Sequence, residues 1–146
     1  MVSNKSAGSA FERELAQVLS SHGFWVHRLQ DNKNGQPADL IVAFNGSTYL
    51  IDCKDCISGT FSLSRIEPNQ HSAMQLWHDT GNGSGLFAIR YGNGNVYLIR
   101  YQDLEDLIGQ GLKGLREEKC STVGRDLEWW MKAATEAGED DCDWMW

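Results

Sequence analysis

The sequence contains no hydrophobic run of about 18 residues, so it predicts no transmembrane helix. Its first ten residues are small and polar and lack the apolar segment of a secretory signal. We therefore expect a protein of the reducing cytoplasm, encoded either by a host cell or by a phage, and no membrane partner. In that compartment the cysteines are predicted to be free thiols. They are Cys53, Cys56, Cys120 and Cys142.

Positive charge is also scarce. The 13 Lys and Arg residues are outnumbered by 20 Asp and Glu residues, and the formal net charge is −7. This balance is unfavourable for nucleic-acid binding, which needs cations near the phosphates. The acids are unevenly distributed, because residues 1–102 contain eight acids and eight bases, which leaves twelve acids and five bases for residues 103–146. The charge therefore argues against DNA binding mainly for the C-terminal third.

Helical and strand patterns alternate along the chain. Apolar residues at helical spacing predict a first helix that starts with Ser9 as its N-cap and ends at Gly23. Strands are predicted at residues 24–29, 40–44, 48–54, 86–91 and 96–101, and helices at 68–78, from 103 and at 125–137. Residues 57–66 have no clear pattern. The order predicts an α/β fold with a central mixed five-stranded sheet flanked by helices.

The same patterns divide the chain into three parts. Residues 1–8 are predicted to be a flexible leader, residues 9–137 a single domain, and residues 138–146 an acidic tail that contains tryptophan. Two hypotheses stand for the tail. It is either a solvated extension that competes with DNA for basic surface, or it is anchored on the same or a neighbouring subunit by Trp144 and Trp146.

Two acids and a lysine are brought together by a predicted hairpin. Asn45-Gly46 is a strong turn signal between two of the strands, so the far ends of these strands meet. Asp39 opens the first strand, and Asp52 and Lys54 close the second. Residues two apart on a strand share a face and lie about 6.6 Å apart. We therefore expect Asp52 and Lys54 on one face, with Asp39 opposite them.

Paired carboxylates beside a cation suit phosphodiester hydrolysis. Mg²⁺ prefers oxygen ligands and keeps positions for water and phosphate oxygens. One or two such ions can activate the attacking water, neutralise the phosphate and support the leaving oxygen, while a lysine stabilises developing negative charge. The alternative interpretation, which the residues alone leave open, is a surface ion-pair cluster.

A nuclease signature stands at the two ends of this hairpin. Pro37-Ala38-Asp39 and Asp52-Cys53-Lys54 resemble the signature of the PD-(D/E)XK nucleases, with one departure, because Ala38 separates the proline from the aspartate. The resemblance implies a restriction-endonuclease-like core. It also implies an endodeoxyribonuclease that uses Mg²⁺, with Mn²⁺ as a substitute.

Within that superfamily, the sequence looks most like the Holliday-junction resolvases. Residues 8–15 and 23–28 resemble the opening of the archaeal resolvases, in which a Glu-Arg pair on the first helix precedes a Gly-Phe strand that ends in Arg. Residues 60–63 and 69–71 resemble the bacterial RecU resolvases. The similarity extends from about Gly8 to Asp106. It implies a homodimer that binds branched DNA, a four-way junction, and makes two symmetric cuts.

The resemblance also assigns roles to individual residues. Helical periodicity does not choose between Glu12 and Glu14, but the family's acid directly precedes an arginine, which implies that Glu12 is a third metal ligand beside Asp39 and Asp52. Lys54 is the implied catalytic cation. Gln70 is carried over as the residue that orients the attacking water or contacts the metal. Contacts to DNA are predicted for three cations, Arg13, Arg28 and Lys33, although Arg13 is equally well interpreted as a plain exposed arginine.

Other functions are weighed against this one. A related nuclease with a nicking, repair or restriction activity would have the same fold, and so would a DNA-binding protein without catalysis. A zinc site is not favoured, because Cys53 and Cys56 have no second pair at zinc spacing. The intact set of acids favours an enzyme over a protein that has lost its activity.

Overall fold

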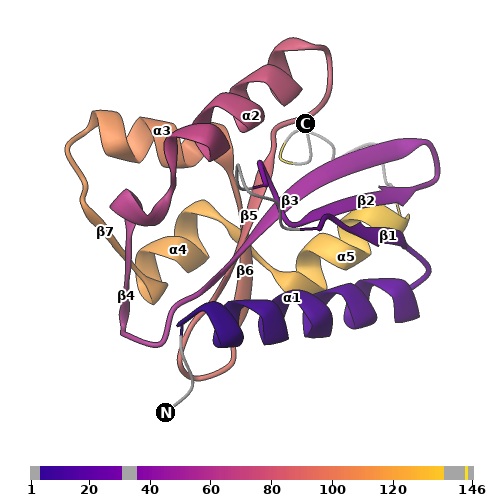
Figure 1. Cartoon of the computed structure of the whole chain (residues 1–146), viewed down its shortest axis with the longest axis horizontal. Coiled ribbons are helices and arrows are strands. Elements are labelled where there is room, and N and C mark those ends of the chain that lie inside the picture. The colour runs from indigo at the N-terminus through magenta and orange to yellow at the C-terminus, as the bar shows by residue number, and fades with distance from the viewer. Residues whose placement is uncertain (1–3, 31–35, 137–143, 145–146) are drawn as a thin grey trace.

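A computed structural model of the chain describes residues 4–30, 36–136 and 144, with side chains from residue 10 onward. Its centre is a mixed sheet of six strands in the order β1-β2-β3-β5-β6-β8 (Figure 1). The strands are β1 (Trp25–Arg28), β2 (Leu40–Phe44), β3 (Ser47–Asp55), β5 (Leu86–Arg90), β6 (Val96–Arg100) and β8 (Arg125–Asp126). The β3–β5 pair is parallel and the other pairs are antiparallel. The predicted mixed α/β fold is confirmed.

The sheet has six strands rather than the predicted five, because the segment predicted as the last helix begins with a strand. β8 occupies its first two residues, and the helix starts only at Leu127. Asp126 explains this start, because its Oδ1 accepts a hydrogen bond from the backbone nitrogen of Trp129 at 2.9 Å. That bond is typical of an N-cap residue, which lies outside the helix that it caps.

Helices connect and cover the strands. They are α1 (Asn4–Ser21), the 3₁₀ helix η1 (Leu63–Arg65), α2 (Pro68–Asp79), α3 (Tyr101–Gly109), α4 (Glu117–Val123) and α5 (Leu127–Glu136). The first helix begins at Asn4, so the predicted N-cap at Ser9 is wrong and residues 4–8 of the expected leader are helical. This stretch contains no proline, and its lysine and alanine are good helix formers.

The helices form two layers, one on each face of the sheet (Figure 1). α1 and α5 pack on one face around the fully buried Trp130, whose ring lies 5.5 Å from that of Phe24 and 5.0 Å from that of Tyr49. α2, α3 and α4 contribute to the core on the other face, where Met74 and Leu104 are fully buried. Both layers meet the central strands, so each face of β3 is fixed by packing.

The turn between β2 and β3 has the predicted hairpin geometry. Asn45 and Gly46 have φ angles of 48° and 85°, the left-handed conformation that a tight hairpin turn requires at both central positions. The strands pair in the register Leu40 with Ile51, and the backbone nitrogen of Asp39 donates to the Ile51 carbonyl at 3.1 Å. The hairpin therefore places Asp39 beside the end of β3 that carries Asp52.

The undecided segment at residues 57–66 forms part of a second, two-stranded sheet. It contributes β4 (Thr60–Ser62), which pairs antiparallel with β7 (Gly114–Arg116). Phe61 and Leu115 are fully buried at this pairing. A side chain at Gly114 would begin 2.6 Å from the Thr60 methyl group, so the close approach of the strands requires glycine there. β4 leads through η1 into α2, which carries Gln70.

Trp144 connects the C-terminal tail to the body of the same chain. It is 9% exposed and its ring lies edge-on to Trp129, at 6.0 Å between centroids. The guanidinium groups of Arg100 and Arg125 lie 5.3 Å and 5.5 Å from its ring, and Arg100 Nη1 donates to the Trp144 carbonyl at 3.3 Å. This favours the hypothesis of an anchored tail. Trp146 and the tail's acids lie outside the described residues.

Cys53, Cys56 and Cys120 are buried free thiols, and Cys142 lies outside the described residues. Within the ranges that the structure describes, no helix is both long enough and apolar enough to cross a membrane.

We predict that Trp144→Ala destabilises the protein. Removing a buried tryptophan side chain costs about 3–5 kcal/mol, which corresponds to a fall in melting temperature of roughly 10 °C in a domain of this size. Trp25→Ala is the matched control, because Trp25 is 60% exposed. Thermal unfolding of both variants checks the prediction. Equal melting temperatures for Trp144→Ala and the wild type would contradict the anchor.

Candidate active site

The predicted carboxylates lie together where β2 begins and β3 ends. Asp39 precedes β2 and is 9% exposed, and Asp52 on β3 is 1% exposed. Both oxygens of Asp39 are held, since Oδ2 accepts from the backbone nitrogen of Cys53 at 2.7 Å and Oδ1 accepts from Gln36 Nε2 at 2.6 Å. Cys53 itself packs into the core, as the strand alternation predicts.

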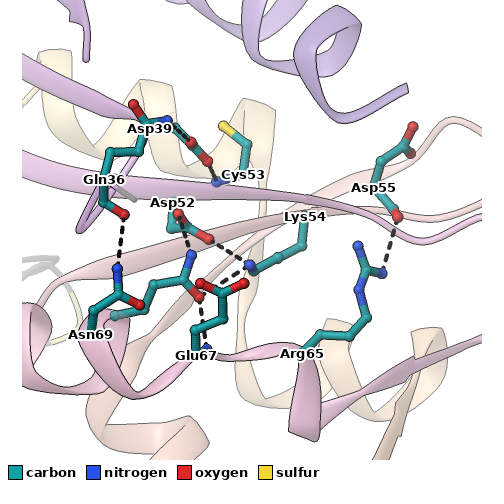
Figure 2. A network of polar contacts seen from close by, with 10 residues as sticks. Gln36, Asp39, Asp52, Cys53, Lys54, Asp55, Arg65, Glu67 and Asn69 are labelled. Atoms are coloured by element: carbon teal, nitrogen blue, oxygen red, sulfur yellow. Dashed lines mark hydrogen bonds and ion pairs between the residues drawn. The ribbon is translucent and has the colours of Figure 1, made fainter. Parts of the chain in front are cut away.

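Asp52, Lys54 and Gln70 form a closed triangle of contacts. Figure 2 shows Lys54 reaching toward Asp52. Lys54 Nζ lies 3.2 Å from Asp52 Oδ2 and donates to Gln70 Oε1 at 3.1 Å. Gln70 Nε2 in turn donates to Asp52 Oδ1 at 3.2 Å. The structure therefore brings together Asp52 and Lys54 of the nuclease signature and Gln70 of the RecU-like segment.

Gln70 also belongs to the first turn of α2. Its Oε1 accepts from the backbone nitrogen of Glu67 at 3.0 Å, and this bond satisfies a donor at the helix start. Pro68 at the beginning of the helix fits the same position, because the first helical residue needs no backbone donor. The local sequence that starts the helix thus fixes the side chain that contacts Lys54 and Asp52.

The two acids of α1 have different surroundings. Glu12 is 16% exposed, lies beside Asp39 and pairs with Arg28, with Nη2 3.3 Å from Oε2. Glu14 is 63% exposed and pairs with Arg90, which is also bound to the carboxylate of Asp55 at the end of β3. The structure therefore places Glu12 at the site and Glu14 away from it, in agreement with the choice that the resemblance made.

Burial and mutual repulsion raise the pKa values of these carboxyl groups. Burial is the largest cause for Glu12, followed by the neighbouring Asp39, and the two raise its pKa to about 8 although Arg28 opposes them. Burial also raises the pKa of Asp52 well above its ordinary value, and the charge of Asp39 adds to this against the opposing effect of Lys54. Ionising Glu12 or Asp52 is therefore harder here than in water, because the neighbouring cations do not fully offset burial and repulsion.

A divalent cation suits this donor set. Among the described side chains, no three of His, Cys, Asp and Glu are grouped as a complete metal cage. Mg²⁺ does not need one, because it is usually bound by one or two carboxylates and keeps several waters. Asp52 Oδ2 is buried and lies 3.2 Å from the Lys54 ammonium, and a carboxylate oxygen keeps a second lone pair that can bind a cation. The residues present thus fit a hydrated divalent cation.

Of the three cations predicted to contact DNA, the structure describes two, Arg13 and Arg28. Arg13 is exposed on α1, next to Glu12 in the sequence. Arg28 ends β1, and its side chain is 42% exposed while it pairs with Glu12. Lys33 lies outside the described residues. Arg28 is therefore the predicted contact that the structure places beside a site carboxylate.

Two residues of the network were not predicted from the sequence. Gln36 binds Asp39 directly, and Asn69 Nδ2 donates to the Gln36 carbonyl at 3.4 Å. Neither has a local signal, because an amide in a loop or at a helix start is common. Their proximity to Pro37 and Gln70 in the sequence was the only available indication.

The model of the archaeal Holliday junction resolvase (Hjc) family matches residues 3–113. This chain belongs to that family. This membership confirms two predictions from the sequence. The chain resembles the resolvases of the PD-(D/E)XK superfamily, and it is a nuclease with the function of a Holliday-junction resolvase. β7, α4, β8 and α5 lie beyond the residues that the Hjc model matches.

Two Hjc proteins are similar to this chain. The crossover junction endodeoxyribonuclease Hjc of Methanocaldococcus jannaschii is 27% identical over 125 residues, which cover 81% of this chain and 87% of that protein. The solved structure of Hjc from Archaeoglobus fulgidus, a Holliday junction resolvase from an archaeal hyperthermophile, superposes with a TM-score of 0.66 at 16% identity. The superposition covers 85% of this chain and 99% of the Archaeoglobus fulgidus chain, and it shows that the two proteins share a fold.

We predict that the metal-free protein loses stability as the pH rises through about 8. The folded-state pKa of Glu12 lies above its ordinary value of 4.5, so the folded protein binds this proton more tightly than the unfolded chain does. That contribution is fully present below the ordinary value and is lost above about 8. Glu12→Gln removes the charge and should raise the melting temperature at pH 9 in EDTA by a few degrees, about 1 kcal/mol or more.

Glu14→Gln is the matched control for this measurement, since Glu14 is exposed and pairs with Arg90 instead. It should leave the pH dependence of the melting temperature unchanged. If Glu12→Gln and the wild type lost stability in parallel between pH 5 and pH 9, the interpretation of Glu12 would be wrong.

Proposed function

We propose that this member of the Hjc family cuts four-way DNA junctions by metal-dependent hydrolysis, with Mg²⁺ as the cofactor and Mn²⁺ as a substitute. Glu12, Asp39 and Asp52 would hold the metal. The observation that carries the proposal is the triangle of Asp52, Lys54 and Gln70, in which a nearly inaccessible carboxylate is held beside an ammonium group.

Each side chain then has a distinct task. When bound, the metal supplies an activated water and neutralises charge on the phosphate. Lys54 is the catalytic cation, which stabilises the negative charge that develops as the phosphodiester is attacked. Gln70 holds both Lys54 and Asp52, so it fixes the distance between the cation and the carboxylate. Because this triangle is buried, its electrostatic interactions are stronger than they would be in water.

We further propose that the protein acts on branched DNA as a homodimer in the cytoplasm. A four-way junction has two equivalent strands to cut, and a two-fold symmetric dimer presents two sites to them. Arg13, Arg28 and Lys33 are the proposed contacts to DNA phosphates. Such contacts position the substrate without reading its sequence, which suits an enzyme that recognises the shape of a junction.

The first test separates binding from chemistry. We expect Lys54→Ala and Asp52→Asn each to lower the rate of junction cleavage by about 10²–10³-fold, because each removes a charge that acts in the transition state. Junction affinity, measured in Ca²⁺ by gel shift, should stay close to that of the wild type. Lys132→Ala, a change of an exposed lysine on α5, is the control. Normal cutting by Lys54→Ala would refute the assignment of the catalytic cation.

The second test concerns the metal and the substrate. Cleavage of a synthetic four-way junction should occur in Mg²⁺ or Mn²⁺ and stop in EDTA or Ca²⁺, because the carboxylates need a catalytically competent cation to neutralise them. A matched linear duplex should be cut far more slowly. Activity that survived chelation would refute the metal-dependent mechanism. Equal cutting of the junction and the duplex would favour a nuclease of another specificity.

A further inference from the structure

Gln36 connects two parts of the active site. It directly precedes Pro37, and its side chain lies beside Asp39 while its backbone carbonyl lies beside Asn69 at the start of α2 (Figure 2). The bond from Gln36 Nε2 to Asp39 Oδ1 is 2.6 Å long, whereas the bond from Asn69 to the Gln36 carbonyl is longer, at 3.4 Å. Gln36 thus touches the strand that carries one carboxylate and the helix that carries Gln70.

The chemistry of Asp39 fixes the orientation of this amide. An ionised carboxylate only accepts hydrogen bonds, so Gln36 must turn its NH₂ group and not its oxygen toward Asp39. This leaves Gln36 Oε1 buried without a hydrogen-bond donor among the described residues. The hydrogen bond to Asp39 therefore decides which way the amide is turned.

The two hydrogen bonds to Asp39 fix the orientation of its carboxylate and leave lone pairs for a metal ion. Cys53 holds one oxygen through its backbone nitrogen, and Gln36 holds the other through its side chain. Each carboxylate oxygen has a second lone pair, so Asp39 can accept both bonds and still bind a cation. Donors to a metal ligand of this kind fix its orientation and commonly change metal affinity by 10- to 100-fold when removed.

The link between Gln36 and Asp39 is short and rigid. Pro37 has a fixed φ angle, and Ala38 is fully buried in the core on the α2 side of the sheet. These two residues restrict the backbone between Gln36 and Asp39, so the Gln36 backbone stays close to the carboxylate that its side chain binds. Ala38 is the residue by which this sequence departs from the nuclease signature, and its burial gives it a structural role.

We infer that Gln36 is a positioning residue for the metal site: its side-chain amide fixes the carboxylate of Asp39, and Asn69 ties it to α2. This inference rests on the proposed function, because it assigns Gln36 a role toward the metal that Asp39 would bind. Gln36 does not touch the reacting atoms, and it acts through Asp39.

The test is a calorimetric titration of the DNA-free protein with Mn²⁺. Gln36→Met preserves the length of the side chain and removes the donor, and we expect the Mn²⁺ dissociation constant to rise about tenfold. Asn69→Ala should produce a smaller rise, because the bond that it removes is long. The matched control is Gln75→Met on α2, which removes a similar amide–aspartate bond, from Gln75 Nε2 to Asp79 Oδ1 at 2.9 Å, on an exposed surface.

Two further measurements separate positioning from folding. The melting temperature of Gln36→Met in EDTA should stay near that of the wild type, and the Mg²⁺ concentration for half-maximal junction cleavage should rise with the Mn²⁺ dissociation constant. A Gln36→Met protein that binds Mn²⁺ as tightly as the wild type would overturn the inference and leave the proposed function intact. A wild-type protein that neither binds Mn²⁺ nor cuts the junction would overturn both.

Discussion

The site depends on holding carboxylates together against their own repulsion. Asp52 is almost inaccessible to solvent, and burial together with the neighbouring Asp39 raises the pKa of Glu12 to about 8. The protein opposes this repulsion with a small number of donors and cations: the Cys53 amide, the Gln36 and Gln70 side chains, Lys54 and Arg28. Two cations face three carboxylates, and burial together with this mismatch raises the pKa values of Glu12 and Asp52.

The geometry of the site is set by local features of the fold, a helix start and a hairpin turn. Gln70 completes the start of α2 and also contacts Lys54 and Asp52, so the geometry of a helix end determines the geometry of the site. The turn at Asn45 and Gly46 likewise determines the register of β2 against β3. Changes that loosen either element would therefore affect the chemistry even where they touch none of the catalytic groups.

Local patterns predicted much of this arrangement. The turn signal and the period of two along the strands were enough to expect Asp39, Asp52 and Lys54 to meet, because a hairpin is decided by neighbouring residues. Helical periodicity could not distinguish Glu12 from Glu14. That choice depends on how α1 packs against the sheet, and before the structure it was supported by the family resemblance alone.

The parts that escaped prediction depend on distant partners. β4 has three residues, and its assignment as a strand rests on β7, which lies about fifty residues later in the chain. Gln36 gave no local signal because an amide acquires a role only from the neighbour that it meets. The roles of the site residues in catalysis, unlike their positions, are decided by chemistry that neither pattern nor fold specifies.

β8 has a consequence for how the protein behaves at high concentration. Without it, β6 would end the sheet and expose an apolar strand edge, which is a template for pairing with another chain. β8 pairs with Tyr97 and Leu98 at that edge, and its own residues are Arg125 and Asp126. Gly124 allows the chain to enter so closely, because a side chain there would begin 2.6 Å from the Leu98 carbonyl oxygen. The region beyond the family-matched residues thus covers the middle of this edge with two charged residues, which disfavours edge-to-edge pairing.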